Sequence, residues 1–151
     1  MQFSIPGVIL AICMYVMNFV IFPFYVIGCH SYIQSYHIML NETRDFVDEV
    51  IDTREITDTM IEDFNYALSS HDVVYSATIF RKVKTINPDP VHPGQTITSY
   101  TIVDDYKTFN TGDRITVICE PITVGPYQSI TRLLLHLPLD EQKIQKTARV
   151  R

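Results

Sequence analysis

Charge is absent from the first thirty residues of the chain. That stretch has no Asp, Glu, Lys or Arg, whereas all 12 basic and 17 acidic residues lie in residues 31–151. About a quarter of these later positions are therefore charged, which is the usual content of a soluble domain. The formal net charge of -5 excludes a nucleic-acid binder driven by positive charge. The layout predicts one uncharged segment followed by one globular domain, and excludes a polytopic membrane protein.

The uncharged segment is long enough to cross a bilayer. Residues 5–29 have Asn18 as their only strongly polar side chain. As a helix they would extend about 37 Å, against a hydrocarbon core of about 30 Å. The basic start, short apolar stretch and small-residue cleavage site of a secretory signal peptide are all missing. We therefore expect a single transmembrane helix at 1–30 in the cell membrane, with Pro23 kinking or locally melting it, and a separate α+β domain at 31–151.

The flanking charges give a preference for orientation. No Lys or Arg precedes the segment, and Arg44 is the only one in the twenty residues that follow it. Acidic residues dominate positions 42–63, next to the larger part of the chain. We expect the N-terminus inside and the domain on the extracytoplasmic side.

A second form of anchoring is also open. Val26, Ile27, Gly28 and Cys29 have the apolar-apolar-small-Cys pattern that precedes lipid modification of a cysteine. Bulky Tyr25 and the length of the apolar stretch argue against it. Cys29 is therefore a possible lipidation site, with a membrane-buried thiol as the alternative.

Two helices are expected before any strand. The apolar spacing continues past the segment, so the first helix should run from about residue 5 to about residue 51, as stem and core together. Residues 58–69 predict a second helix, with Thr57 or Thr59 as its cap and Met60, Phe64 and Leu68 on its apolar side. The apolar stripe of the first helix comprises Tyr32, Tyr36, Met39, Leu40, Thr43, Phe46, Val47 and Val50.

The rest of the chain is typical of strands. Residues 73–84 are rich in β-branched and aromatic side chains, and 87–94 contain three prolines and a glycine, which predict a loop. Residues 96–107 are β-like, 110–124 are a turn at Thr111-Gly112-Asp113 and a strand, and 129–139 alternate partly. The basic tail at 143–151 is an edge-strand candidate. The predicted fold class is α+β, a long N-terminal helix packed on a small antiparallel sheet.

Cysteine chemistry is limited. Cys13 and Cys29 fall in the apolar segment, so Cys119 alone belongs to the domain and no disulfide can form within it. We expect Cys119 to be a small core residue on a strand.

Several stretches resemble a known family. FVDEV at 46–50, REITDTMIEDFNYAL at 54–68, GDRITVICE at 112–120 and the terminal ARVR resemble the TadE-like pseudopilins of tight-adherence secretion systems, particularly divergent members from Gram-positive bacteria. The resemblance implies a pilin-like fold and a minor pilin or pseudopilin, with other pilin-like subunits or secretion-platform proteins as partners. One departure is that Gly7 is followed at the fifth position by Ile12 rather than Glu. This points to an unprocessed, low-copy component.

An assembly helix should make specific protein contacts, whereas a passive anchor should tolerate replacement. Apolar helices in a bundle can exchange lipid contacts for one another. The aromatic residues expected to make these contacts are Phe19, Phe22, Tyr25, Tyr32 and Tyr36. The alternative function is an extracytoplasmic binding protein, held by a single span or by a lipid on Cys29.

No pattern of catalytic or metal-binding residues stands out. His30 and His37 share a helix face, His71-Asp72 lacks a nucleophile elbow, and Asp89, Asp104, Asp105 and Asp113 lack calcium-loop spacing. We expect these aspartates to be solvated turn carboxylates. The sequence predicts a protein that is not an enzyme and needs no cofactor, metal, nucleic acid or small-molecule substrate. The basic tail invites intersubunit pairing with the acidic run at 42–63, although a soluble tail and a protected sheet edge explain the same residues and are the favoured interpretation.

Overall fold

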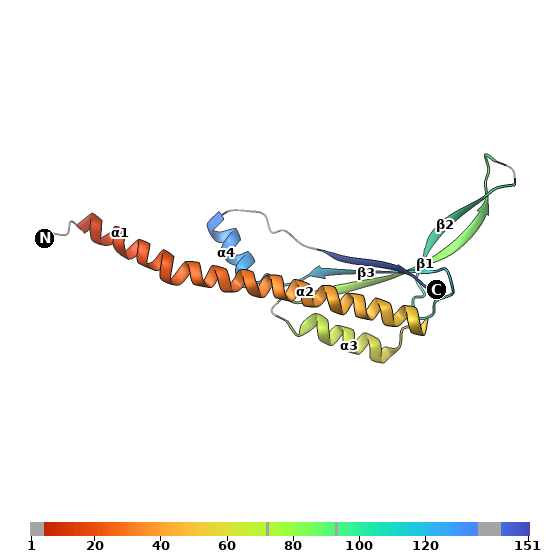
Figure 1. Cartoon of the computed structure of the whole chain (residues 1–151), viewed down its shortest axis with the longest axis horizontal. Helices are drawn as coiled ribbons and strands as arrows, with labels where there is room; N and C mark the ends of the chain where they lie inside the picture. Colours follow the sequence, from red (N-terminus) through yellow and green to blue (C-terminus); the bar gives the residue numbers. More distant parts are fainter. Residues whose placement is uncertain (1–4, 72, 93, 136–142) are drawn as a thin grey trace.

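The computed structural model describes residues 5–71, 73–92, 94–135 and 143–151. A long helix leads into a small domain with a four-stranded antiparallel sheet, in the order β2-β1-β3-β4 (Figure 1). This is the predicted α+β arrangement. The elements are α1 Ile5–Val16, the π-helical turn η1 Met17–Ile21, α2 Phe22–Thr53, α3 Asp58–Ser69, β1 Tyr75–Pro88, β2 Thr96–Val103, β3 Arg114–Pro121, α4 Pro126–Leu135 and β4 Ile144–Arg149.

The first three elements form one continuous helix. Pro23 was expected to kink or melt it, but the helix passes through this position without melting, and a π turn lies immediately before it. Proline has no N–H to donate and its ring crowds the carbonyl four residues earlier. The wider turn accommodates both effects, and the N–H of Phe22 bonds the carbonyl of Met17 five residues back. The side chain of Asn18 donates to the carbonyl of Met14 at 2.8 Å, so the helix itself satisfies its polar side chain.

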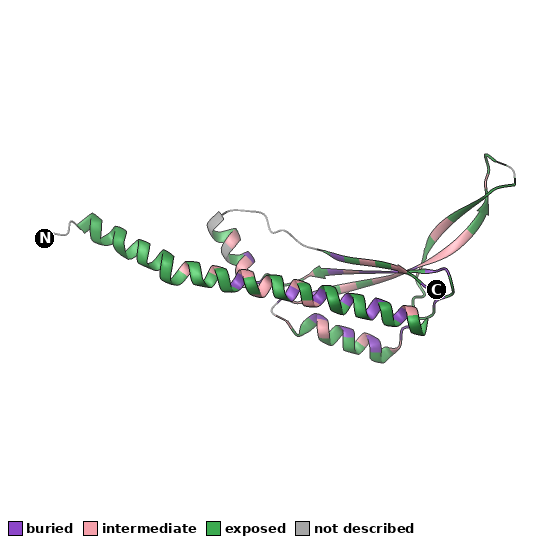
Figure 2. Ribbon diagram, viewed as in Figure 1, coloured by how far each residue is buried: buried purple, intermediate pink, exposed green. Residues whose placement is uncertain are grey.

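The burial of this helix changes along its length. From Ile5 to Ile27 the side chains are exposed or half-buried, and from Gly28 onward one stripe is buried against the domain (Figure 2). This confirms that the helix is core as well as stem. Leu40, which was predicted to join the stripe, is 40% exposed because it lies beside the buried Met39 rather than under the sheet. The buried stripe of α2 is Gly28, Ser35, Met39, Thr43, Phe46, Val47 and Val50.

The second helix has the predicted bounds, Asp58–Ser69. Thr57 is its N-cap, and its hydroxyl oxygen accepts from the N–H of Met60 at 3.3 Å. Met60, Phe64 and Leu68 are buried as expected. The ring of Phe64 stacks on Phe46 of α2 with centroids 4.4 Å apart, so the two helices share one core.

The sheet has an unusual shape because β1 serves two partners. Residues 75–82 pair with β3, whereas residues 81–88 pair with β2. The β1–β2 hairpin therefore projects past the rest of the sheet (Figure 1). The strand includes Asn87 and Pro88, which were predicted as loop, because cross-strand pairing continues to Thr96. The tail forms β4, which pairs with β3 at one end of the strand order and is the predicted edge strand.

Residues 126–135 form a helix that the sequence did not predict. Apolar and polar residues alternate only partly over 129–139, and this pattern did not indicate a helix. Residues 136–139 lie outside the described part of the chain. The helix begins at a cap: the N–H of Gly125 donates to Oε1 of Gln128 at 3.1 Å, and the amide of Ser129 bonds the Gly125 carbonyl. The local sequence Gly-Pro-x-Gln was the available signal, since proline is favoured in the first helical turn.

The core lies between the second half of the long helix, α3 and one face of the sheet. Most of its fully buried residues come from α2 and β3, including Cys119 as predicted, and they are joined by Ile144 of β4 and by Val73 and Val150, which lie just outside the strands. The cluster is Met39, Phe46, Val47, Val50, Ile56, Met60, Phe64, Leu68, Val73, Tyr75, Phe109, Ile115, Val117, Cys119, Ile144 and Val150.

Candidate assembly and anchoring surface

The largest apolar surface is the first half of the long helix. Within the described residues, the helix Ile5–Thr53 is long and apolar enough to cross a membrane. Residues 5–27 would extend about 35 Å at about 1.5 Å per residue, which matches a hydrocarbon core of about 30 Å. Phe19, Phe22 and Phe24 are 68%, 63% and 64% exposed. Burying such side chains requires lipid or another protein.

The five predicted contact residues fall into two groups. Phe19 and Phe22 are exposed, whereas Tyr25, Tyr32 and Tyr36 are half-buried against their own chain. Tyr25 and Tyr32 both pack on Tyr127 of α4, with ring centroids 5.1 and 5.8 Å away. Tyr36 packs against the core. The structure thus leaves Phe19 and Phe22 as the predicted residues with most surface available to another subunit.

Gly28 allows α4 to approach the long helix closely. A Cβ at this position would lie 2.9 Å from the backbone nitrogen of Tyr127 and 3.2 Å from its Cα. Only glycine leaves room for backbone at that distance. The contact fixes α4 beside α2 at the point where the exposed apolar half of the helix ends. The local sequence around Gly28 indicated only a lipidation pattern, and this packing role was not predicted.

The three cysteines are free and differ in environment. Cys13 is exposed on α1, and Cys29 is half-buried within the unbroken helix α2. Cys119 is fully buried on β3, and its Sγ lies 3.4 Å from Oγ1 of Thr43. Burial raises the pKa of the Cys119 thiol, and the hydrogen bond with Thr43 opposes this only in part. Cys119 is therefore placed as a core residue, not as a nucleophile.

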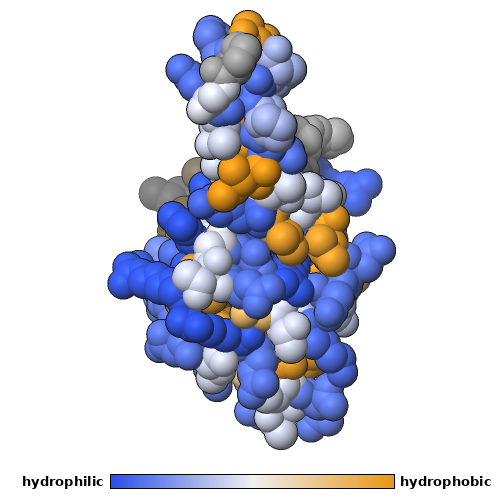
Figure 3. All heavy atoms as spheres, turned by 90° about the vertical axis from the view of Figure 1, so that its right-hand side faces the viewer, coloured by the Kyte–Doolittle hydropathy of each residue, from blue (hydrophilic) through white to orange (hydrophobic). Residues whose placement is uncertain are grey.

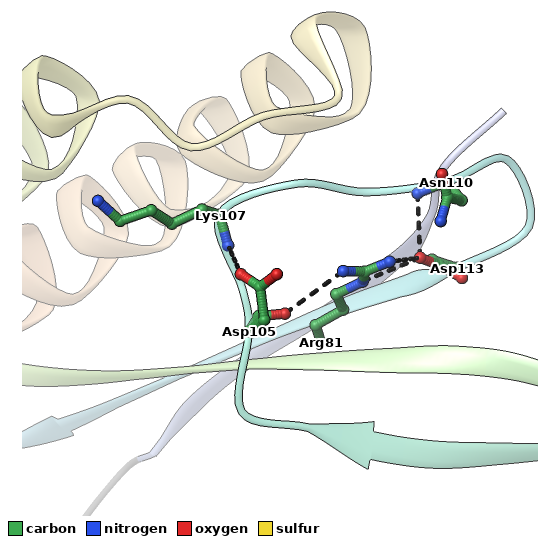
Figure 4. Close-up of polar contacts among 5 residues, drawn as sticks. All are labelled: Arg81, Asp105, Lys107, Asn110 and Asp113. Carbon is green, nitrogen blue, oxygen red and sulfur yellow. Dashed lines mark hydrogen bonds and ion pairs between the residues drawn. The ribbon is translucent and has the colours of Figure 1, made fainter.

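Arg81 and Asp113 form a buried ion pair between β1 and the start of β3 (Figure 4). Nε and Nη2 of Arg81 donate to Oδ2 of Asp113 at 3.0 and 2.8 Å. The backbone N–H of Asn110 donates to the same oxygen at 3.0 Å. Asp113 was expected to be a solvated turn carboxylate, and this prediction was wrong because the arginine thirty-two positions earlier lies next to the turn. Asp104 and Asp105 are exposed, as predicted.

The ion pair anchors the loop between β2 and β3. Nη1 of Arg81 donates to the Asp105 carbonyl at 3.5 Å, and the backbone N–H of Lys107 donates to Oδ1 of Asp105 at 3.1 Å (Figure 4). The loop then bonds to the end of α2, since the N–H of Phe109 donates to the Arg54 carbonyl at 2.9 Å. This cluster connects sheet, loop and helix, and none of the buried side-chain nitrogens and oxygens among the described residues lacks a hydrogen-bond partner.

The same contacts set the ionisation of Asp113. Burial acts to raise its pKa, but the hydrogen bond from Asn110 and the hydrogen bonds and positive charge of Arg81 outweigh burial, and the pKa lies below its ordinary value. Asp113 is therefore a structural carboxylate, charged at neutral pH.

The two charged regions of the sequence lie on neighbouring elements. Asp48 and Asp52 near the end of α2 line one open groove together with Lys146 and Arg149 of β4. Lys143 pairs with Glu120 of β3 at 2.9 Å, and Nη2 of Arg54 donates to the Arg151 carbonyl at 2.8 Å. Part of the opposite charge is thus already brought together within one chain. Pairing between subunits stays a prediction.

The other titratable groups singled out in the sequence lie on α2, at the end of α3 and in the β1–β2 turn. Among the described residues, no three His, Cys, Asp or Glu side chains are close enough together to hold a metal ion. His30 and His37 are exposed on α2, and the His71-Asp72 pair includes a residue outside the described part of the chain. Asp89 accepts hydrogen bonds from the Val91 N–H and pairs with His92, which closes the hairpin turn.

The projecting hairpin carries scattered apolar side chains. Ile86, Val91, Ile97 and Ile102 are exposed on it. Figure 3 views the molecule from the end where the hairpin projects, and its hydrophobic side chains lie in small separate areas among hydrophilic ones. On this face of the molecule they do not form one continuous apolar patch.

No protein-family model, curated protein or solved structure matches the chain. The exposed half of the long helix and the domain packed on its second half are therefore the features that bear on function.

Proposed function

We propose that this chain is a membrane-anchored structural subunit of the pilin-like kind, a minor pilin or pseudopilin of a tight-adherence type pilus or secretion apparatus. The observation that carries the proposal is the single helix Ile5–Thr53, whose first half is exposed and uncharged and whose second half is the spine of the domain. Because the two halves are one helix, contacts made by the first half in the membrane also position the domain outside it.

The proposed orientation follows from the charges. The N-terminal end of the helix has no charged side chain, and the domain that follows carries the acidic excess. If the uncharged N-terminus stays inside, the domain lies on the extracytoplasmic side. In this orientation the hairpin β1–β2 projects away from the membrane (Figure 1).

Assembly is proposed to use one face of the exposed helix. Phe19, inside the π turn, and Phe22, directly after it, are the two predicted contact residues that remain exposed, and the proposed face passes through both. Phe24 is equally exposed, but it lies about 200° around the helix from Phe22. Phe22 and Phe24 therefore form a matched pair at nearly the same membrane depth, and only Phe22 lies on the proposed face.

A photo-crosslinking amino acid placed at Phe22 or at Phe24 tests the proposal in native membranes. We expect discrete protein adducts from position 22, as from Phe19, and mainly lipid adducts from position 24. Adducts identified by mass spectrometry would name the neighbouring subunits. If none of the three positions captures protein, the helix is a passive anchor and the alternative, an anchored extracytoplasmic binding protein, replaces the pilin-like function.

The form of the anchor is tested separately by the intact mass of the mature protein. We expect a chain that retains residues 5–28, because Gly28 packs on Tyr127 and continues the helix into the domain. A chain beginning at a lipid-modified Cys29 would remove the span, and the assembly argument with it.

A further inference from the structure

The end of the domain that faces the apolar half of the long helix differs from the rest of the surface. Residues 121–135, which run from the end of β3 through α4, contain no Asp or Glu, and Arg132 is their only basic residue. The chain as a whole has 17 acidic residues. Ile122, Val124 and Leu133 in this stretch are 65%, 48% and 76% exposed. The exposed apolar side chains therefore lie in a stretch without carboxylates, which anionic lipid headgroups would repel.

The position of α4 along the long helix is fixed by two contacts. Its first turn packs on Gly28, and its Tyr127 lies between Tyr25 and Tyr32, with the Tyr25 and Tyr127 hydroxyls 3.5 Å apart. Gly28 is about 35 Å along the helix from Ile5, at about 1.5 Å per residue. This places α4 just beyond a hydrocarbon core of about 30 Å.

The direction of α4 also fits a position at the surface of the membrane. In Figure 1 it leaves α2 sideways, rather than running along it, at the end of the domain nearest the exposed apolar helix. A helix at this angle to a membrane-crossing helix lies along the membrane surface. Clustered tyrosines are typical of the boundary between lipid and water, where the ring is apolar and the hydroxyl is hydrated.

We infer that α4, with the β3–α4 loop, is a membrane-interface element that rests its apolar side chains in the headgroup layer of the bilayer crossed by the long helix. The inference depends on the proposed membrane span. Leu133, Val124 and Ile122 enter the interface, and Arg132 meets the phosphate groups. The domain is thereby held against the membrane by two elements, so its tilt is fixed relative to the long helix.

The absence of tryptophan from the chain makes a direct test possible. Single variants of the full chain, Leu133→Trp, Phe19→Trp and Tyr66→Trp, each carry one tryptophan, whose emission is excited selectively over that of the tyrosines. They are reconstituted in vesicles of phosphatidylcholine and phosphatidylglycerol that carry bromine either near the headgroup or deep in the acyl chain. Tyr66 on α3 is the matched control because it is 75% exposed, against 76% for Leu133.

We expect Leu133→Trp to lose fluorescence in vesicles with shallow bromine and to show a blue-shifted emission. Phe19→Trp should be quenched mainly by deep bromine, and Tyr66→Trp by neither. If Leu133→Trp behaves like Tyr66→Trp while Phe19→Trp is quenched deeply, α4 does not touch the membrane and the inference is wrong, although the span holds. If Phe19→Trp is unquenched, the proposed span fails and the interface helix fails with it. Ile122→Trp provides a second variant on the loop and should agree with Leu133→Trp.

Discussion

The backbone nitrogen of Tyr127 lies 2.9 Å from the point where a side-chain carbon on Gly28 would stand. Two helices almost a hundred positions apart in the chain are thus in backbone contact at the edge of the exposed apolar segment. The contact positions the cluster of Tyr25, Tyr32 and Tyr127. It also explains why the residue before Cys29 is glycine without any reference to lipidation.

Replacing Gly28 by alanine should separate α4 from α2. Overpacking of this kind typically costs about 1–3 kcal/mol, and the better helix propensity of alanine returns up to about 1 kcal/mol. We expect a net loss of about 1–2 kcal/mol, with faster hydrogen exchange of the α4 amides. Gly7→Ala is the control, because Gly7 is exposed on α1 and should gain stability. Unchanged exchange in α4 would show that the two helices do not depend on this contact.

Removing the carboxylate of Asp113 should destabilise the domain strongly. Asp113→Ala leaves the buried guanidinium of Arg81 without its partner, and the loss of one member of a buried pair costs about 3–5 kcal/mol. The same change at exposed Asp104 should shift the free energy of unfolding by less than about 0.5 kcal/mol. Chemical denaturation of the full chain in detergent measures both. Equal effects at the two positions would mean that the pair contributes little.

Acid should weaken the domain through the same carboxylate. The pKa of Asp113 is lowered in the folded state from its ordinary 3.8, so the unfolded chain takes up this proton first as the pH falls. The stabilisation is fully present above pH 3.8 and is lost as the pH falls through the lower folded value. We therefore expect the free energy of unfolding to drop as the pH falls below 3.8. The drop should be smaller in Asp113→Asn. If the free energy of unfolding of the variant and of the unchanged protein falls in parallel with pH, Asp113 is not the carboxylate responsible.

Cys119 should be inert to thiol reagents while the domain is folded. Its side chain is fully buried and its raised pKa keeps it as the thiol at neutral pH. The test uses full-length protein with Cys13→Ser and Cys29→Ser, so that Cys119 is the only cysteine. We expect labelling only after denaturation. Adding Tyr66→Cys on exposed α3 provides a position that should label at once. Rapid native labelling of Cys119 would mean that β3 opens readily.

Local sequence signals determined much of this fold. The absence of charge before residue 31 defined the apolar half of the long helix, and its helical spacing continued into the domain stripe through Met39, Thr43 and Phe46. Helix α3 was predictable because Thr57 as a cap and the spacing of Met60, Phe64 and Leu68 agree with one another. The strands β3 and β4 were predictable from β-branched residues and an edge composition. In each case neighbours within a few residues carry the information.

Only the tertiary structure decided how these elements use one another. Sequence alone could not pair Arg81 with Asp113, show that β1 continues through Pro88 along β2, or bring Tyr127 onto Gly28. Each depends on a partner far along the chain, and the free energy of burial and hydrogen bonding then outweighs local preference. The same holds for three tyrosines of the long helix. In the sequence they look like further exposed aromatics of an assembly helix, but in the structure Tyr25, Tyr32 and Tyr36 are turned toward their own domain. The sequence by itself determined an apolar helix joined to an α+β domain, and tertiary packing decided which of its side chains stay exposed for the proposed contacts with lipid and other subunits.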